Sequence, residues 1–97
     1  MRIFKDKELT QEIIELDLGI VEAGETKTFM FYVLNDSKAN LHELKFSILH
    51  DEVKIIEAPK ELSSYANDEL TIEWNPSVTL KEGLKAQLRV EGKELWG

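Results

Sequence analysis

The chain has 97 residues, the size of one small domain, and its 42% of hydrophobic residues supports a core and excludes an intrinsically disordered chain. Its 19 Asp and Glu outnumber its 12 Lys and Arg, the net charge is −7, and the lysines alternate with acids, so we expect no nucleic-acid partner. Cysteine is absent, which excludes disulfides, a thiolate metal site and a cysteine nucleophile.

The N-terminal residues lack the apolar stretch of a signal peptide, and the longest apolar run, residues 29–34, is too short to cross a bilayer. We therefore expect a virion-associated or cytoplasmic protein that is not secreted by a signal peptide and has no membrane partner. Residues 1–12 are interpreted as an N-terminal arm or edge strand, and residues 13–97 as a single domain. Ile3 and Phe4 either pair at a sheet edge or dock on a neighbouring molecule.

Residues 12–18 carry apolar side chains at every second position and end at Gly19, which predicts a strand, and residues 23–25 predict a turn. The next predicted strand, residues 28–34, is unusual because it is apolar on both faces. Alternate positions form two sets. If Phe29, Phe31 and Val33 face the core, then Met30, Tyr32 and Leu34 face outward, and a register shift of one residue exchanges the two sets. Either the N-terminal segment or a neighbouring strand covers the outer set, or the outer set is an exposed binding patch.

Further strands are predicted at residues 42–49, 53–57, 69–75 and 84–91, because polar and apolar residues alternate there or β-branched residues dominate. Trp74 falls on the inward face, so we expect it in the core. Gly92 and Lys93 predict a two-residue turn. A short helix from residue 59 to residue 65 is the one competing interpretation, since proline is tolerated at a first helical position.

Six or seven short strands separated by turns predict an all-β fold, an immunoglobulin-like antiparallel β-sandwich of about seven strands. Trp96 lies next to the C-terminal residue of the sequence. Its side chain either closes one end of the sandwich or serves as an anchor in a partner's pocket.

Several residues follow a known family pattern. Residues 16–21 (Leu-Asp-Leu-Gly-Ile-Val) and 23–26 (Ala-Gly-Glu-Thr), then 33–37 (Val-Leu-Asn-Asp-Ser) and 74–76 (Trp-Asn-Pro), resemble the signature of Hydin-type (ASH) immunoglobulin-like modules. The chain departs from the pattern at Leu18 and Trp74, where phenylalanine is commoner. The resemblance covers roughly residues 16–92. It implies a non-enzymatic structural or assembly module, similar to stand-alone accessory or decoration proteins of bacteriophage capsids and tails.

The residues offer little for catalysis. His42 and His50 lie at opposite ends of one predicted strand, too far apart to share a metal, and the serines lack a nucleophile context. We therefore expect no enzyme activity, no catalytic residues, no metal site and no cofactor. Acidic pairs such as residues 51–52 are interpreted as solvated loop charges.

The predicted function is an interaction module that binds a protein of a larger assembly, such as a viral capsid or tail, and self-association is allowed. Two alternatives stay open: a cytosolic adaptor or chaperone-like domain, and a small carbohydrate-binding module that uses Tyr32, Tyr65 and Trp96. The predicted partner-binding residues are Ile3, Phe4, Met30, Tyr32, Leu34 and Trp96.

Overall fold

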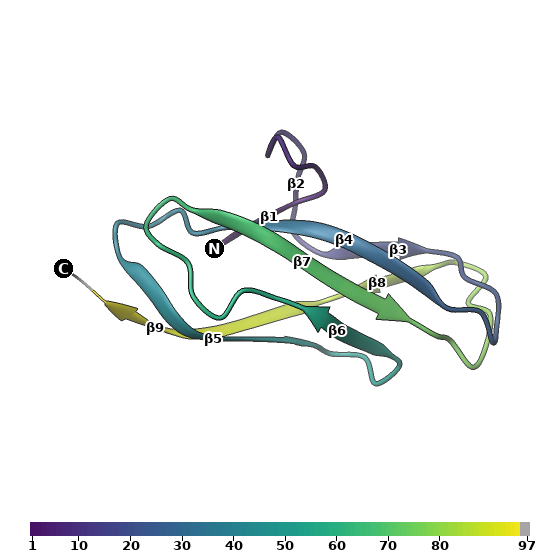
Figure 1. The fold of residues 1–97 in the computed structure, drawn as a ribbon. Coiled ribbons are helices and arrows are strands. Elements are labelled where there is room, and N and C mark those ends of the chain that lie inside the picture. Colours follow the sequence, from purple (N-terminus) through teal and green to yellow (C-terminus); the bar gives the residue numbers. More distant parts are fainter. Residues whose placement is uncertain (96–97) are drawn as a thin grey trace.

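The computed structural model describes residues 1–95, and within that range the chain is all-β, with no helix (Figure 1). The strands are β1 (Arg2–Phe4), β2 (Glu12–Ile13), β3 (Leu16–Gly19), β4 (Lys27–Leu34), β5 (Asn40–Ile48), β6 (Val53–Glu57), β7 (Asn67–Trp74), β8 (Leu84–Ala86) and β9 (Leu88–Leu95). No described segment forms a helix with the length and apolarity needed to span a membrane.

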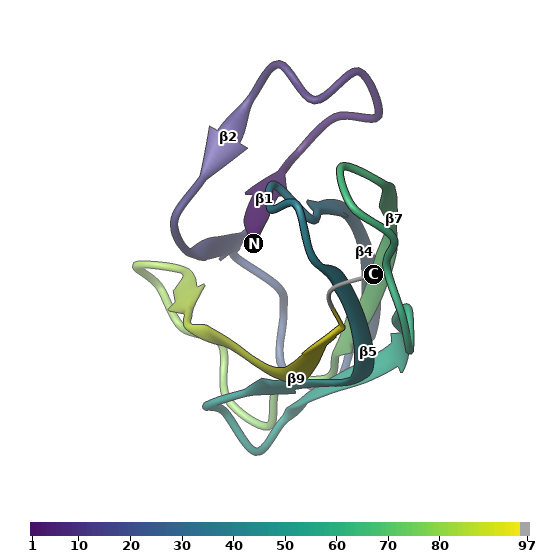
Figure 2. The same ribbon diagram turned by 90° about the vertical axis from the view of Figure 1, so that its left-hand side faces the viewer.

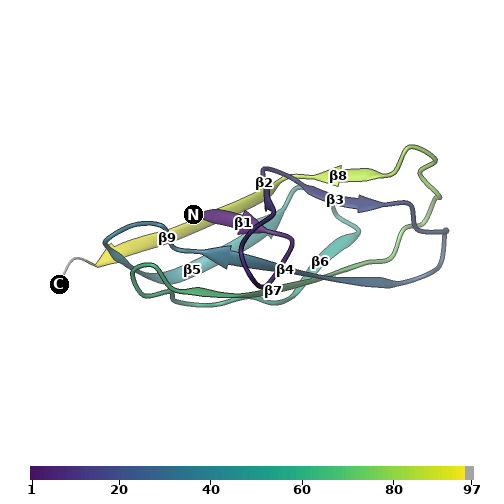
Figure 3. The same ribbon diagram turned by 90° about the horizontal axis from the view of Figure 1, so that it is seen from above.

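The strands form two layers. One layer is a five-stranded antiparallel sheet in the order β2-β1-β4-β7-β6, and the other contains the antiparallel pairs β3–β8 and β5–β9. Only Gln87 separates β8 from β9, so the two strands follow one path along the second layer (Figure 3). The order β1-β4-β7-β6 is that of strands A, B, E and D of an immunoglobulin domain, and β5–β9 matches strands C and F. The predicted fold class is confirmed.

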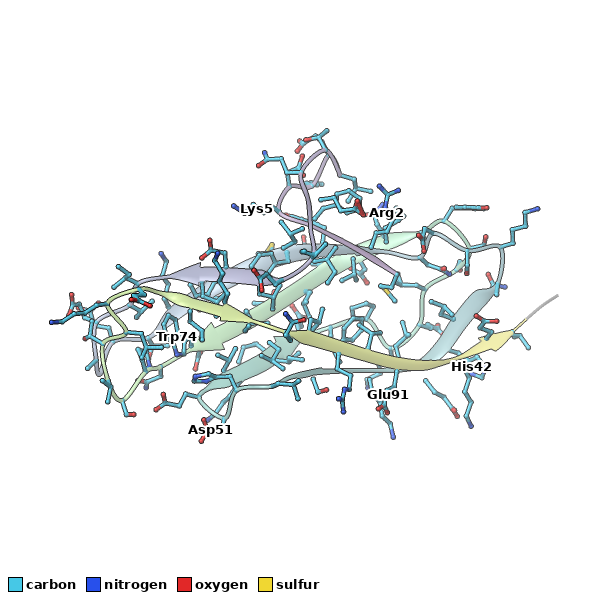
Figure 4. The ribbon with its side chains drawn as sticks, turned by 180° about the vertical axis from the view of Figure 1, so that it is seen from behind. Arg2, Lys5, His42, Asp51, Trp74 and Glu91 are labelled. Carbon is cyan, nitrogen blue, oxygen red and sulfur yellow. The ribbon has the colours of Figure 1, made fainter. Side chains whose placement is uncertain are left out.

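The core lies between the two layers and contains side chains from strands of both. It includes Leu16 of β3, Leu44 of β5 and Ile72 of β7. Trp74 at the end of β7 has no exposed surface, as the inward phase of its strand predicts. Figure 4 shows it among the strands, away from the outer rim.

Strand β4 is central in the five-stranded sheet, paired with β1 on one side and with β7 along its whole length on the other. Its alternation places Phe31 and Val33 in the core, while Met30 is 48% exposed on the outer face. Tyr32 and Leu34 lie opposite β1 and are only partly buried, so the outer face of β4 is partly covered beside β1 and most open at Met30.

The predicted turn at Gly92 and Lys93 is wrong, because β9 continues to Leu95 and pairs with β5 as far as Asn40. The glycine serves packing instead. It lies opposite a β-bulge in β5, where a Cβ at position 92 would come within 2.7 Å of the Leu44 side chain. Any larger residue at position 92 would require the end of the Leu44 side chain to shift.

One more predicted strand differs in detail from the structure. The strand predicted at residues 12–18 divides into β2, which pairs with β1, and β3, which pairs with β8 in the other layer. Residues 59–65 form a loop and not a helix. Leu62 in that loop makes two backbone hydrogen bonds with Leu41 of β5, at 2.8 and 2.9 Å, which hold the loop against the second layer.

Candidate interaction surfaces

The predicted binding residues of β1 and β4 divide between two faces. Phe4 lies opposite Tyr32 and Ile3 lies opposite Val33, and residues directly opposite each other point to the same face. Ile3 therefore faces the core with Val33, whereas Phe4 shares the outer face with Tyr32 and with the exposed Met30. Leu34 lies on the outer face opposite Arg2, and Trp96 lies outside the described residues.

Phe4 is only 3% exposed although it lies on this outer face. The guanidinium of Arg2 lies 5.3 Å from the centre of its ring, and Arg2 Nε donates a 2.6 Å hydrogen bond to Glu12 Oε2. This ion pair lowers the pKa of the Glu12 carboxyl and raises that of Arg2. The terminal ammonium of Met1 lies 3.2 Å from Asp36, and its hydrogen bond lowers the pKa of that carboxyl.

The loop between β1 and β2 is organised by Asp6. Its carboxylate accepts hydrogen bonds from the Thr10 hydroxyl, from the Thr10 backbone N–H at 3.0 Å and from the Gln11 backbone N–H at 2.8 Å. These bonds, the hydroxyl first, lower the pKa of Asp6. The N-terminal segment, residues 1–13, is thus held on its own domain by strand pairing and by three carboxylates.

A second surface is the edge of β9 that faces away from β5. The backbone N–H of Leu49 donates to the carbonyl of Gln87, so Gln87 directs its backbone groups toward β5. Hydrogen-bonded and non-hydrogen-bonded pairs alternate in an antiparallel ladder. Arg89 and Glu91 therefore also bond toward β5, while the backbone groups of Leu88 and Val90 point to the opposite edge.

Along that opposite edge, β3 pairs with β8 as far as Leu16 opposite Ala86. From Leu88 to Gly92 no strand of the described chain pairs there. In an immunoglobulin domain this is the position of strand G, beside F. Figure 2 shows β5 flanking β9 on its paired side. The sequence predicts the strand itself, but period-two alternation carries no signal for which edge of a strand stays unpaired.

The side chains along this free edge alternate sharply. Leu88 and Val90 are partly buried against the core, whereas Arg89 and Glu91 are exposed. Figure 4 shows Glu91 projecting outward from β9. Neither Arg89 nor Glu91 makes an ion pair with another residue in the range 1–95.

A shallow hollow of about 610 Å³ lies at the bulge between β5 and β9. Its lining is Glu43, Leu44, Lys45, Lys60, Glu91, Gly92 and Lys93. Lys93 Nζ lies 2.8 Å from Glu43 Oε2, so opposite charges partly neutralise each other across it. Its lining therefore offers charged groups for polar contacts.

The two histidines lie apart from each other, and only His50 is near an acidic pair, with its Nδ1 3.9 Å from Asp51 Oδ1. His42 lies on β5, and His50 lies in the turn after it, where Nδ1 accepts a 3.2 Å hydrogen bond from the Glu52 backbone N–H. The Glu52 carboxylate accepts a hydrogen bond from the Ser77 backbone N–H at 2.9 Å, and the contact with Ser77 lowers its pKa. Among residues 1–95, no three His, Asp or Glu side chains group closely enough to hold a metal ion.

Comparisons of the chain with protein-family models, with curated proteins and with solved structures found no match. The resemblance to Hydin-type modules therefore stays a prediction from the sequence.

Proposed function

We propose that the chain is a non-enzymatic protein-binding module that accepts an added β-strand at the free edge of β9. The observation that carries this proposal is the stretch from Leu88 to Gly92, where one edge of a sandwich strand has no partner within the described chain. Such an edge presents a row of backbone donors and acceptors, and an extended segment satisfies them by joining the sheet.

The position of the edge supports the proposal. A strand added there would lie where strand G completes an immunoglobulin sheet, and its inward residues would cover the partly buried Leu88 and Val90. Backbone hydrogen bonds would supply affinity, and alternate side chains would supply specificity. The outer face of β4 is a weaker candidate, because Phe4 is already buried by the N-terminal segment and Met30 is the most exposed apolar residue left there.

The experiment is a selection of random displayed peptides on the purified domain. We expect the selected peptides to be extended, with apolar residues at alternate positions, and to slow amide hydrogen exchange at Leu88, Val90 and Gly92. A Val90→Pro variant removes the N–H at the middle of the edge and should weaken binding at least about 10-fold. Val78→Pro, at an exposed loop residue, is the matched control and should bind as the unmodified chain does.

Two results would contradict the proposal. One is peptides that bind the Val90→Pro variant as tightly as the unmodified chain. The other is peptides that perturb the amides around Met30 and leave those of β9 unchanged, which would assign recognition to the outer face of β4. The exchange measurement uses the unmodified chain, so it decides the matter even if the proline variant does not fold.

The setting of a virus particle, which the sequence resemblance implies, stays part of the proposal. Sedimentation of the pure domain with capsid or tail particles measures it directly. Co-sedimentation that is lost in Val90→Pro and kept in Val78→Pro would support docking on a particle through β9. Failure to sediment with any particle would contradict a role on virus particles but would not contradict strand addition at β9.

A further inference from the structure

We infer that the strand accepted by this edge is the same edge of a second copy, so that two chains pair β9 with β9 in antiparallel orientation about a twofold axis at Val90. This inference rests on the proposed function and specifies its partner. It follows from three features of β9: the direction of its backbone groups, the order of its charges and the place where β3 stops.

The backbone direction fixes which residues lie opposite each other. Leu88 and Val90 point their N–H and C=O groups to the free edge, and Gly92 follows by the same alternation. With the axis at Val90, the two copies of Val90 become a hydrogen-bonded pair, and each Leu88 becomes a hydrogen-bonded pair with Gly92 of the second copy. Every backbone group that faces the open edge between Leu88 and Gly92 then has a partner.

The charge order selects this register among the alternatives. With the axis at Val90, each Arg89 lies opposite Glu91 of the second copy, so two ion pairs form from side chains that make none within the described chain. These are non-hydrogen-bonded positions, where the strands approach more closely and side chains interact best. An axis at Glu91 would oppose Glu91 to itself and Arg89 to Lys93, and an axis at Arg89 would oppose two guanidinium groups.

The apolar face agrees with the same register. Both copies of Val90 and both copies of Leu88 lie on the inward face, beside Phe46 and Ile48 of β5, which are also only partly buried. An axis at Gly92 would also pair opposite charges, Glu91 with Lys93, but would place the carboxylate of Glu94 against Val90 on this face. Pairing begins beyond Ala86, because β3 occupies the edge up to that residue.

Sedimentation equilibrium of charge variants tests the pairing. We expect a concentration-dependent monomer–dimer equilibrium for the unmodified chain. Arg89→Glu and Glu91→Arg should each weaken dimerisation by about 10- to 30-fold, because each replaces two attractive cross-strand pairs with two repulsive ones. The double variant Arg89→Glu/Glu91→Arg should restore the dimer, since the two charges exchange places. Lys85→Glu, an exposed charge on β8 beside β3, is the control outside the paired stretch.

Cross-linking tests the register. The chain contains no cysteine, so an equimolar mixture of an Arg89→Cys and a Glu91→Cys variant has one thiol per molecule. The mixture should form the mixed disulfide faster than either variant forms its own, because positions 89 and 91 face each other and neither faces itself.

A chain that stays monomeric at millimolar concentration would overturn this inference. A dimer insensitive to the charge variants would do so too. Either result leaves the proposed function intact if the peptide selection still finds ligands of the β9 edge. If the chain is monomeric and the selection finds no ligand of the β9 edge, both the proposed function and the pairing of two copies are contradicted.

Discussion

Asn35 directly follows β4 and is 1% exposed, so its polar groups must be satisfied inside the protein. Its side-chain nitrogen lies 2.8, 3.0 and 3.1 Å from the carbonyl oxygens of Ala39, Leu62 and Ser63. Its side-chain oxygen accepts hydrogen bonds from the backbone N–H and the hydroxyl of Ser37. One amide thus links the β4–β5 turn to the loop before β7.

Replacing Asn35 with alanine should lower the free energy of unfolding by about 2–4 kcal/mol, because several buried groups lose a partner at once. Asn75→Ala is the matched control. Its side chain is exposed, and the change should cost less than about 0.5 kcal/mol. Urea unfolding of both variants gives the two values. Equal costs would contradict a structural role for the Asn35 amide.

Two glycines offer a matched comparison of backbone strain and crowding. Gly24 and Gly83 have φ angles of +84° and +79°, and alanine is strained at both. A Cβ at Gly24 meets nothing within 4 Å, whereas at Gly83 it would lie 3.0 Å from the Gly19 carbonyl oxygen.

We expect Gly24→Ala to cost about 1 kcal/mol and Gly83→Ala about 2 kcal/mol or more, measured by urea unfolding. The excess arises because the backbone at Gly19, the last residue of β3, must move. Equal costs would show that the turn before β8 relaxes freely and that the contact between these two glycines does not constrain β3.

At the scale of elements, the buried ring of Phe4 anchors β1 on the outer face of β4. Phe4→Ala should then cost about 3–4 kcal/mol, because a ring that is 3% exposed leaves a void between β1 and the outer face of β4. Ile14, 91% exposed, provides the control, and Ile14→Ala should change stability by less than about 0.5 kcal/mol. Thermal and urea unfolding measure both. A small cost for Phe4→Ala would favour an independent docking arm.

The N-terminal segment should also respond to acid before the rest of the domain. The pKa values of Asp6 and Glu12 lie below their ordinary values of 3.8 and 4.5, because Thr10 and Arg2 hydrogen-bond to the ionised carboxylates. A lowered folded pKa contributes stability that is present above the unfolded pKa and lost as pH falls through the folded one.

We therefore expect residues 5–13 to loosen at a pH below these ordinary values, while β4 and β7 stay paired. Amide NMR signals followed from neutral to acidic pH measure this. Glu12→Gln should remove the part that depends on Arg2 and weaken the segment already at neutral pH. Loosening of β7 at the same pH as residues 5–13 would contradict a separate, acid-sensitive segment.

How far the sequence predicts these elements depends on what fixes each one. Alternation within a strand is local, so the inward positions Leu70, Ile72 and Trp74 follow from the sequence alone. The pairing of a strand depends on distant residues. The break at residues 14–15 arises because β2 joins β1 while β3 joins β8, and no local pattern marks it.

Glycine at position 92 shows the same limit. A glycine followed by a lysine is typical of a turn, but here the glycine lies within a strand and leaves room for the Leu44 side chain across the sheet. The unpaired edge of β9 could not be predicted from the sequence for a related reason. The charges of Arg89 and Glu91 are visible in the sequence, whereas the absence of a neighbouring strand is a property of the assembled sheet.

At the scale of the whole molecule, the net charge of −7 opposes the association of two copies. This repulsion acts over the size of the domain, 48 × 25 × 16 Å, whereas the ion pairs between Arg89 and Glu91 act at contact. The screening length falls from about 30 Å at 0.01 M salt to about 8 Å at 0.15 M and about 3 Å at 1 M. Moderate salt therefore screens the repulsion, and high salt also screens the ion pairs.

Dimerisation should accordingly strengthen between about 0.01 and 0.15 M NaCl and weaken again toward 1 M. Arg89→Gln/Glu91→Gln keeps the net charge at −7, since it removes one charge of each sign, but lacks the ion pairs. Its weaker dimer should strengthen with salt and show no later decline. Sedimentation of both proteins across this salt series separates the two contributions. Identical curves would mean that the two charges do not meet across the twofold axis, whatever holds the copies together.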